Sequence, residues 1–128
     1  MALSVSRKPH LANKIVMVGG LDGCGKTLFS PIISALERVE LPTYSYEIEH
    51  YCSLNFLQKL SLNTASTLIR MQTDLKLYNT MMGREVNFRP TDLSSVQLYH
   101  NPTQYFERLF KPGDEAIPDV VRKKNPIL

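Results

Sequence analysis

The chain has 128 residues, of which 43% are hydrophobic and 21% charged, and its net charge is +3. This length and composition predict one folded domain and exclude wholesale disorder, while the charge is too small to indicate a nucleic-acid partner by itself. The two cysteines form no disulfide framework, and no apolar run approaches the roughly 20 residues that span a bilayer. We therefore expect a cytoplasmic protein with no membrane and no nucleic-acid partner.

The most informative stretch is Lys14–Thr27. Its apolar run 15–18, Ile-Val-Met-Val, has the length and β-branched content of a strand buried on both faces of a parallel sheet. From Gly20 the chain matches the pattern Gly-x-x-x-x-Gly-Lys-Ser/Thr of phosphate-binding loops, and a segment with helical spacing follows. The four fixed positions are Gly20, Gly25, Lys26 and Thr27.

Each part of this motif has a physical role in binding phosphates. Glycines allow the backbone N–H groups to turn inward, and the start of the next helix adds unpaired donors and the positive end of its dipole. Lys26 is then expected against the terminal phosphates, and the Thr27 hydroxyl is a candidate Mg²⁺ ligand. The predicted nucleotide-binding residues are Gly20, Gly23, Cys24, Gly25, Lys26 and Thr27.

A helix with one buried stripe is predicted over residues 25–39, and Pro31 is expected to kink it. Residues 43–48 are rich in aromatic and β-branched side chains and predict a second strand. Glu47 and Glu49 stand at its carboxyl end, where open α/β sheets bind ligands, so they are candidate substrate contacts. They are also the best substitutes for the Mg²⁺-binding carboxylate that the rest of the sequence lacks; the alternative is a solvated loop.

The segment after the second strand is expected to be helical. A short helix is predicted over about 54–60, and a longer one follows, with Asn63 or Thr64 as the cap of its start and Gly83 at its end. The apolar side chains of the longer helix are expected to face the core. They are Leu68, Met71, Leu75, Tyr78 and Met82, and the opposite face carries Arg70, Asp74, Lys76 and Asn79.

A polar link, residues 84–95, separates this helix from the next apolar-patterned stretch. Within it, Arg84 and Arg89 are candidate substrate or phosphate contacts in an anion-binding loop or a lid, and the alternative is a pair of solvated arginines. A helix is then predicted over about 102–111, and a shorter one is expected to begin at Pro118.

These elements predict an α/β protein, a P-loop three-layer sandwich with a parallel sheet that is helix-rich after the second strand. Because 128 residues are few for a complete sheet and residues 127–128 look like the start of a further strand, we expect a single domain that is incomplete at its C-terminus. The chain would then be the N-terminal part of a larger fold. A cut sheet edge favours association with another chain, including a homo-oligomer.

The loop Gly20-Leu-Asp-Gly-Cys-Gly-Lys-Thr27 resembles the phosphate loop of thymidylate-kinase-like nucleoside monophosphate kinases, which carries the same Leu-Asp-Gly before Gly-Lys. This resemblance covers about residues 14–40. It implies that Lys26 and Thr27 contact the triphosphate and Mg²⁺, and that Asp22 lies near the phosphoryl acceptor. Lys26 and Asp22 are accordingly the expected catalytic residues.

The rest of the chain is similar to sulfotransferase-type P-loop proteins, in which a mostly helical stretch leads to a strand after a basic, Pro-containing segment. Lys123–Leu128 would be that segment here. The resemblance implies a loop that holds the phosphosulfate of 3′-phosphoadenosine 5′-phosphosulfate without metal. The loop of that family usually ends Ser-Gly-Thr-Thr, whereas residues 24–27 of this chain are Cys-Gly-Lys-Thr.

The sequence thus predicts a P-loop nucleotide-binding transferase. The leading hypothesis is a phosphotransferase that uses ATP and Mg²⁺ on a small-molecule or saccharide acceptor, with Lys26 stabilising charge on the transferred group. One alternative is sulfuryl transfer from 3′-phosphoadenosine 5′-phosphosulfate. The other is a truncated module that binds nucleotide and catalyses nothing.

Overall fold

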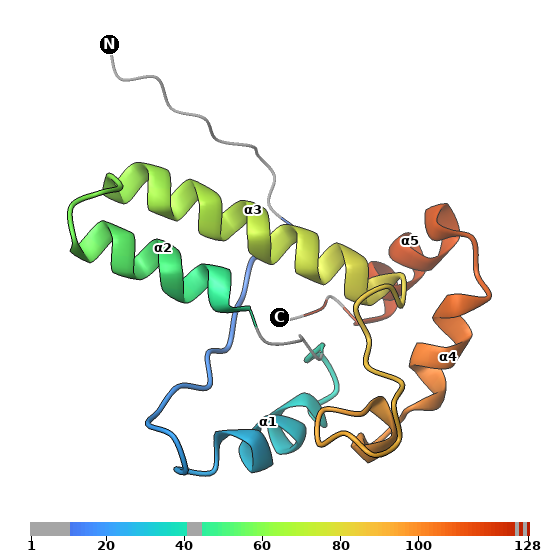
Figure 1. Ribbon diagram of the computed structural model, residues 1–128. Helices are drawn as coiled ribbons and strands as arrows, with labels where there is room; N and C mark the ends of the chain where they lie inside the picture. The colour runs from blue at the N-terminus through green and yellow to red at the C-terminus, as the bar shows by residue number, and fades with distance from the viewer. Residues whose placement is uncertain (1–10, 41–44, 125, 127) are drawn as a thin grey trace.

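Helices form all the regular structure of residues 11–40, 45–124, 126 and 128, the part of the chain that the computed structural model describes. The elements are α1 (Lys26–Ser34), α2 (Tyr46–Phe56), α3 (Leu62–Met81), the short 3₁₀ helix η1 (Val96–Leu98), α4 (Thr103–Leu109) and α5 (Gly113–Lys124). Figure 1 shows α2 and α3 as an antiparallel pair, with α4 and α5 near the C-terminal end of α3. The helix α1 lies apart from the α2–α3 pair, on the other side of the C-terminus.

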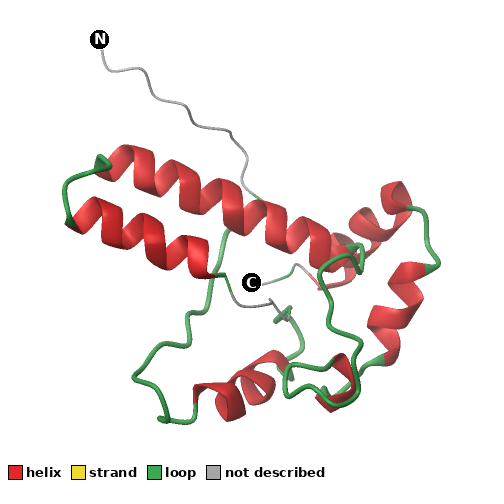
Figure 2. Cartoon of the chain, in the orientation of Figure 1, coloured by secondary structure: helices red, strands yellow, loops and turns green. Residues whose placement is uncertain are grey.

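The predicted parallel sheet is wrong, because the described residues contain helices and loops and no strand (Figure 2). The apolar run 15–18 is extended, but the Met17 side chain is 79% exposed rather than buried. Among the described residues, Leu128 alone pairs with this stretch: Val16 N–H donates to Leu128 O (2.8 Å), and Leu128 N–H donates to the O of Lys14, just before the run (3.1 Å). A parallel strand needs neighbours along its length, and one residue does not provide them.

The second predicted strand is also wrong where the structure describes it. Residues 46–48 are the first turn of α2, and residues 43–44 lie outside the described part. Ser45 precedes α2 in an extended conformation, and its hydroxyl donates to Glu47 Oε2 (2.8 Å). Glu47 and Glu49 lie in the first turn, where the helix dipole favours negative charge, so helix-start chemistry outweighs the strand propensity of the neighbouring aromatic residues.

The helix after the loop is shorter than predicted and lacks the expected buried stripe. α1 ends at Ser34 instead of residue 39, and none of its residues is buried. Pro31 lies inside it and has no N–H to donate, which weakens its last turns. Three of its large apolar residues, Leu28, Phe29 and Ile32, are exposed, and so is Leu36 just beyond its end.

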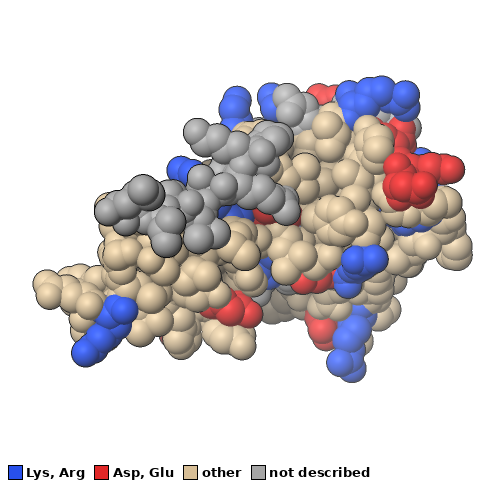
Figure 3. Space-filling view, turned by 90° about the horizontal axis from the view of Figure 1, so that it is seen from above, with Lys and Arg blue, Asp and Glu red and all other residues tan. Residues whose placement is uncertain are grey.

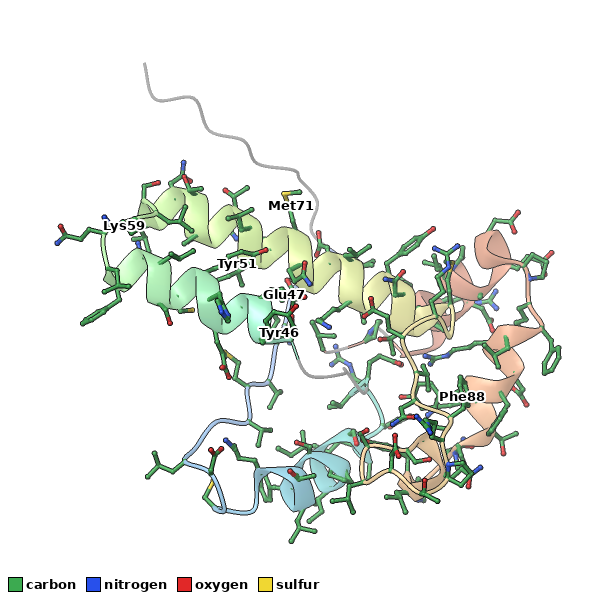
Figure 4. The ribbon with its side chains drawn as sticks, in the orientation of Figure 1. Tyr46, Glu47, Tyr51, Lys59, Met71 and Phe88 are labelled. Atoms are coloured by element: carbon green, nitrogen blue, oxygen red, sulfur yellow. The ribbon has the colours of Figure 1, made fainter. Side chains whose placement is uncertain are left out.

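The long helix is confirmed, but its predicted core face is mostly wrong. α3 begins after Ser61, whose hydroxyl oxygen accepts the N–H of Thr64 (3.1 Å), and it ends before Gly83. Met71 is 59% exposed and points away from α2 (Figure 4), and Leu75 is 51% exposed. The buried residues of α3 are Ala65, Thr73, Asp74, Lys76, Leu77, Thr80 and Met81.

Two charged residues of α3 are buried beside partners that lie outside the helix. Asp74 Oδ1 accepts the backbone N–H of Ala12 (2.8 Å), and Lys76 Nζ lies 3.6 Å from Glu85 Oε2. Paired polar groups can be buried at modest cost, whereas unpaired ones cannot. The periodicity of the apolar residues therefore misplaces the buried face of this helix.

The remaining helices agree partly with the sequence. The short helix expected near 54–60 is replaced by α2, which ends at Phe56, whereas α4 lies within its predicted range. α5 begins at Gly113 and includes Pro118, so it starts five residues earlier than expected.

Two hydrophobic clusters form the core, and α1 contributes to neither. The first joins α3 to α5 and consists of Leu77, Met81, Val120 and Leu128, with Leu11, Ala12 and Ile117 packed against it. The second surrounds η1 and α4 and consists of Val96, Tyr99 and Tyr105, with Val86 and Phe88 against it.

A buried ion pair connects the segment after α1 to α4. Arg108 donates to both carboxylate oxygens of Glu40 (NH1–Oε2 2.7 Å, NH2–Oε1 2.9 Å) and to Thr80 O (3.1 Å). Glu40 is fully buried, and Arg108 lies 4.7 Å over the Tyr105 ring. Burial alone would lower the pKa of Arg108, but the hydrogen bonds and charge of Glu40 raise it, so the pair stays ionised.

Arg108→Met should lower the free energy of unfolding by about 3–5 kcal/mol, because it leaves the Glu40 carboxylate buried without its partner. Urea denaturation measures this loss. The double variant Arg108→Met/Glu40→Leu should lose less than the sum of the two single variants. As the matched control, Arg122→Met breaks an exposed pair with Asp119 and should cost no more than about 1 kcal/mol. Additive losses in the double variant would contradict the buried pair.

The burial of Tyr99 should make the free energy of unfolding fall at alkaline pH. Burial raises the pKa of its phenol above 10.0, and a hydrogen bond with Ser34 opposes this only in part. The contribution of the neutral Tyr99 phenol to the free energy of unfolding is therefore complete below pH 10. It is lost as the pH rises through the higher pKa that Tyr99 has in the folded state. Urea midpoints between about pH 9 and about pH 11 should fall less for Tyr99→Phe than for the parent, and Tyr46→Phe, at an exposed tyrosine, is the control. An equal fall of the urea midpoint with pH in Tyr99→Phe and in the parent would contradict the raised pKa of Tyr99.

Candidate functional site

The phosphate loop, residues 20–27, lies between the extended segment and α1 (Figure 1). Three of its glycines have backbone angles that other residues rarely adopt, with φ of 153° at Gly20, 79° at Gly23 and 89° at Gly25. Gly25 also precedes the first residue of α1 as its N-cap. The glycines of the motif therefore stand where the backbone needs them.

The loop is closed on one side and open on the other. A Cβ at Gly20 would lie 2.5 Å from Cys24 Sγ, so the Cys24 side chain packs directly on Gly20. Cys24 N–H donates to Leu21 O (3.2 Å), which tightens the turn. At Gly23 and Gly25 a Cβ would meet nothing within 4 Å, so that side of the loop is accessible.

The first turn of α1 presents backbone donors. Leu28 and Phe29 both donate to Gly25 O (3.0 Å each), and these are the first bonds of the helix. Within the described residues, the N–H groups of Lys26 and Thr27 have no acceptor. Such groups at a helix N-terminus attract anions.

The Lys26 side chain folds back over the loop. Its ammonium donates to Gly20 O (2.6 Å) and lies 3.6 Å from Asp22 Oδ1. The side chain is 35% exposed, and the Asp22 side chain is fully exposed. The structure thus brings together the two predicted catalytic residues.

The predicted substrate carboxylates do not join this loop. Glu47 lies beside α3, where the charge of Lys76 acts on it, and Figure 4 shows it apart from the loop that leads into α1. The pKa of Glu47 is lowered by a hydrogen bond from its own backbone N–H and by a second one from Ser45. Glu49 lies in the same turn of α2.

Arg84 and Arg89, the two predicted substrate contacts, interact with residues that are close to them in the sequence. Arg84 N–H donates to Asn79 O (2.8 Å), and its guanidinium lies 6.0 Å over the Tyr78 ring. Arg89 is exposed, and its N–H donates to Asn87 Oδ1 (3.0 Å). The structure shows neither arginine in contact with the phosphate loop.

Asn87 was missed by the sequence analysis and organises the link that holds the two arginines. Its side-chain amide donates to Asp92 Oδ2 (3.1 Å) and Ser94 Oγ (2.8 Å), and its backbone carbonyl oxygen accepts the N–H of Val96 (2.8 Å). Asn followed by Asp and Ser at short spacing is the available signal for such a turn. The result is an ordered connection to η1.

The donor set of the loop fits nucleotide phosphates. Lys26, the open glycine side and the first-turn N–H groups all favour anions. Thr27 offers one hydroxyl to Mg²⁺, an ion that keeps several waters and binds through phosphates rather than through a cage of protein ligands. No cluster of three or more His, Cys, Asp or Glu residues occurs in the described part that could hold a metal by itself.

No protein-family model matches the chain, and no curated protein or solved structure matches it. Among the described helices, none has the length and apolar character needed to cross a membrane. The phosphate loop is therefore the feature of the chain from which a function can be proposed.

Gly20→Ala should disturb the phosphate loop without unfolding the protein. The added Cβ would push Cys24 Sγ away and make its thiol react severalfold faster with iodoacetamide, followed by site-resolved mass spectrometry. The free energy of unfolding should fall by about 1–3 kcal/mol, because an alanine is strained at the φ of 153° that Gly20 adopts, although the loop lies outside both hydrophobic clusters. Gly19→Ala, where a Cβ meets nothing within 4 Å, is the control, and Cys52 is the internal reference. Equal Cys24 rates in both variants would contradict this packing.

Proposed function

We propose that the phosphate loop binds the phosphates of an adenine nucleotide and that the protein is a P-loop transferase. The simplest reaction is phosphoryl transfer from ATP with Mg²⁺ to a small-molecule or saccharide acceptor. One observation carries the proposal: the Lys26 ammonium, the open glycine side and the unpaired N–H groups of Lys26 and Thr27 converge at the start of α1.

The loop residues have distinct roles in this proposal. Lys26 moves its ammonium from Gly20 O to the terminal phosphates, where it stabilises the negative charge of the transferred group. The N–H groups at the start of α1 orient the phosphates, and the Thr27 hydroxyl binds Mg²⁺, which would neutralise charge between phosphates. Asp22 would lie near the acceptor, as the resemblance to the loop of thymidylate-kinase-like nucleoside monophosphate kinases implies.

The proposal takes a small molecule as the partner, and the mixed charge of one face of the described surface is compatible with it. Figure 3 shows basic and acidic side chains scattered over the face seen from above, without a broad basic field. A nucleic-acid interface normally gathers Lys and Arg along one face or groove.

A second candidate is a sulfotransferase-like protein that binds 3′-phosphoadenosine 5′-phosphosulfate. The hydrogen bonds of Leu128 with Lys14 and Val16 favour it, because they bring the end of the basic, Pro-containing segment beside the run that enters the loop. In this case the loop would hold the phosphosulfate and Lys26 would act without metal.

Titration calorimetry of the purified chain separates these candidates. The kinase-like proposal expects ATP to bind more tightly with Mg²⁺ than without it, and more tightly than 3′-phosphoadenosine 5′-phosphate. Preference for the bisphosphate without metal would favour the sulfotransferase-like candidate. Binding of neither nucleotide would contradict both.

Lys26→Ala should weaken ATP–Mg²⁺ binding by about 10- to 100-fold, because it removes a charge-assisted contact worth roughly 1.5–3 kcal/mol. Thr27→Ala should weaken binding only when Mg²⁺ is present. Lys59→Ala removes the same charge at an exposed position beyond α2, far from the loop in Figure 4, and is the control. An unchanged affinity in Lys26→Ala, measured by calorimetry, would refute the loop as the binding site.

A further inference from the structure

In the described part of the chain, the Asp22 carboxylate has one ion-pair partner, the ammonium of Lys26, which lies 3.6 Å from Asp22 Oδ1. The Asp22 side chain is fully exposed, so packing does not dictate where its carboxylate lies. The same ammonium donates to Gly20 O at 2.6 Å. The Lys26 ammonium therefore donates a hydrogen bond to Gly20 O and has the Asp22 carboxylate beside it as an ion-pair partner.

An incoming phosphate would need the same ammonium. A lysine has three N–H donors on one small group, and a carboxylate beside it occupies space and neutralises charge that the phosphate would use. We infer that Asp22 is an internal competitor for the anion: its carboxylate stands in for a phosphate beside Lys26 and must be displaced when nucleotide binds. This inference rests on the proposed function of the loop.

The competition from Asp22 should favour the Mg²⁺ complex of a nucleotide over the metal-free nucleotide. Once displaced, the Asp22 carboxylate remains close to the phosphates and repels them, and this repulsion is stronger for the metal-free nucleotide than for its Mg²⁺ complex, which carries less negative charge. Asp22 is thus a specificity-determining residue that disfavours metal-free polyphosphates.

Calorimetry with inorganic pyrophosphate and with ATP, each with and without Mg²⁺, tests this inference. Asp22→Asn should bind the metal-free ligands about two- to fivefold more tightly than the parent, the range expected for an exposed ion pair, and the Mg²⁺ complexes with a smaller gain. Asp22→Glu keeps the charge and should retain the preference of the parent. Glu37→Gln removes the same charge at an exposed position after α1 and controls for net charge.

The outcomes separate this inference from the proposed function. Equal or weaker metal-free binding by Asp22→Asn, while Lys26→Ala still loses binding, would overturn the role of Asp22 and leave the phosphate loop in place. An equal gain in Glu37→Gln would also overturn it, because the effect would then be one of net charge. Absence of binding by the parent to every one of these ligands would overturn the inference together with the proposed function.

Discussion

The buried ion pair between Glu40 and Arg108 anchors the chain segment that follows the phosphate loop and α1. α1 has no buried residue and joins neither hydrophobic cluster, and its last residue, Ser34, hydrogen-bonds the Tyr99 side chain. Glu40 follows α1 closely and is fixed by both of its carboxylate oxygens to a guanidinium of α4, which also reaches Thr80 O at the end of α3. A buried pair of this kind adds little net stability against an apolar alternative, but it fixes orientation because either charge alone would be costly.

The exposure of the phosphate loop limits the interactions that could bind a ligand there. The loop and the first turn of α1 are accessible, so binding has to come from hydrogen bonds and charge rather than from burial of the ligand. Lys26 supplies the charge and Asp22 opposes it, and both belong to the same short loop. Affinity should therefore be sensitive to salt and to the charge of the ligand.

The sequence predicts the features that are local. The Gly-x-x-x-x-Gly-Lys-Thr pattern leads into α1 as expected, and the spacing of α3 gives its extent, because caps and turns depend on nearby residues. The buried face of α3 could not be predicted, since Asp74 is buried through Ala12, which lies 62 positions away. The Glu40–Arg108 pair spans 68 positions and has no local signal. The strand prediction failed because Leu128 is the only described residue whose backbone hydrogen-bonds to the apolar run 15–18.

The most direct test of the account is a nuclear magnetic resonance titration of the ¹⁵N-labelled chain with ATP and Mg²⁺. The account predicts saturable shifts of the backbone N–H signals of Gly23, Gly25, Lys26 and Thr27, with the signals of α3 unchanged. Saturable shifts confined to α2 and α3, with these four signals unmoved, would show that nucleotide binds elsewhere and would contradict the assignment of the phosphate loop.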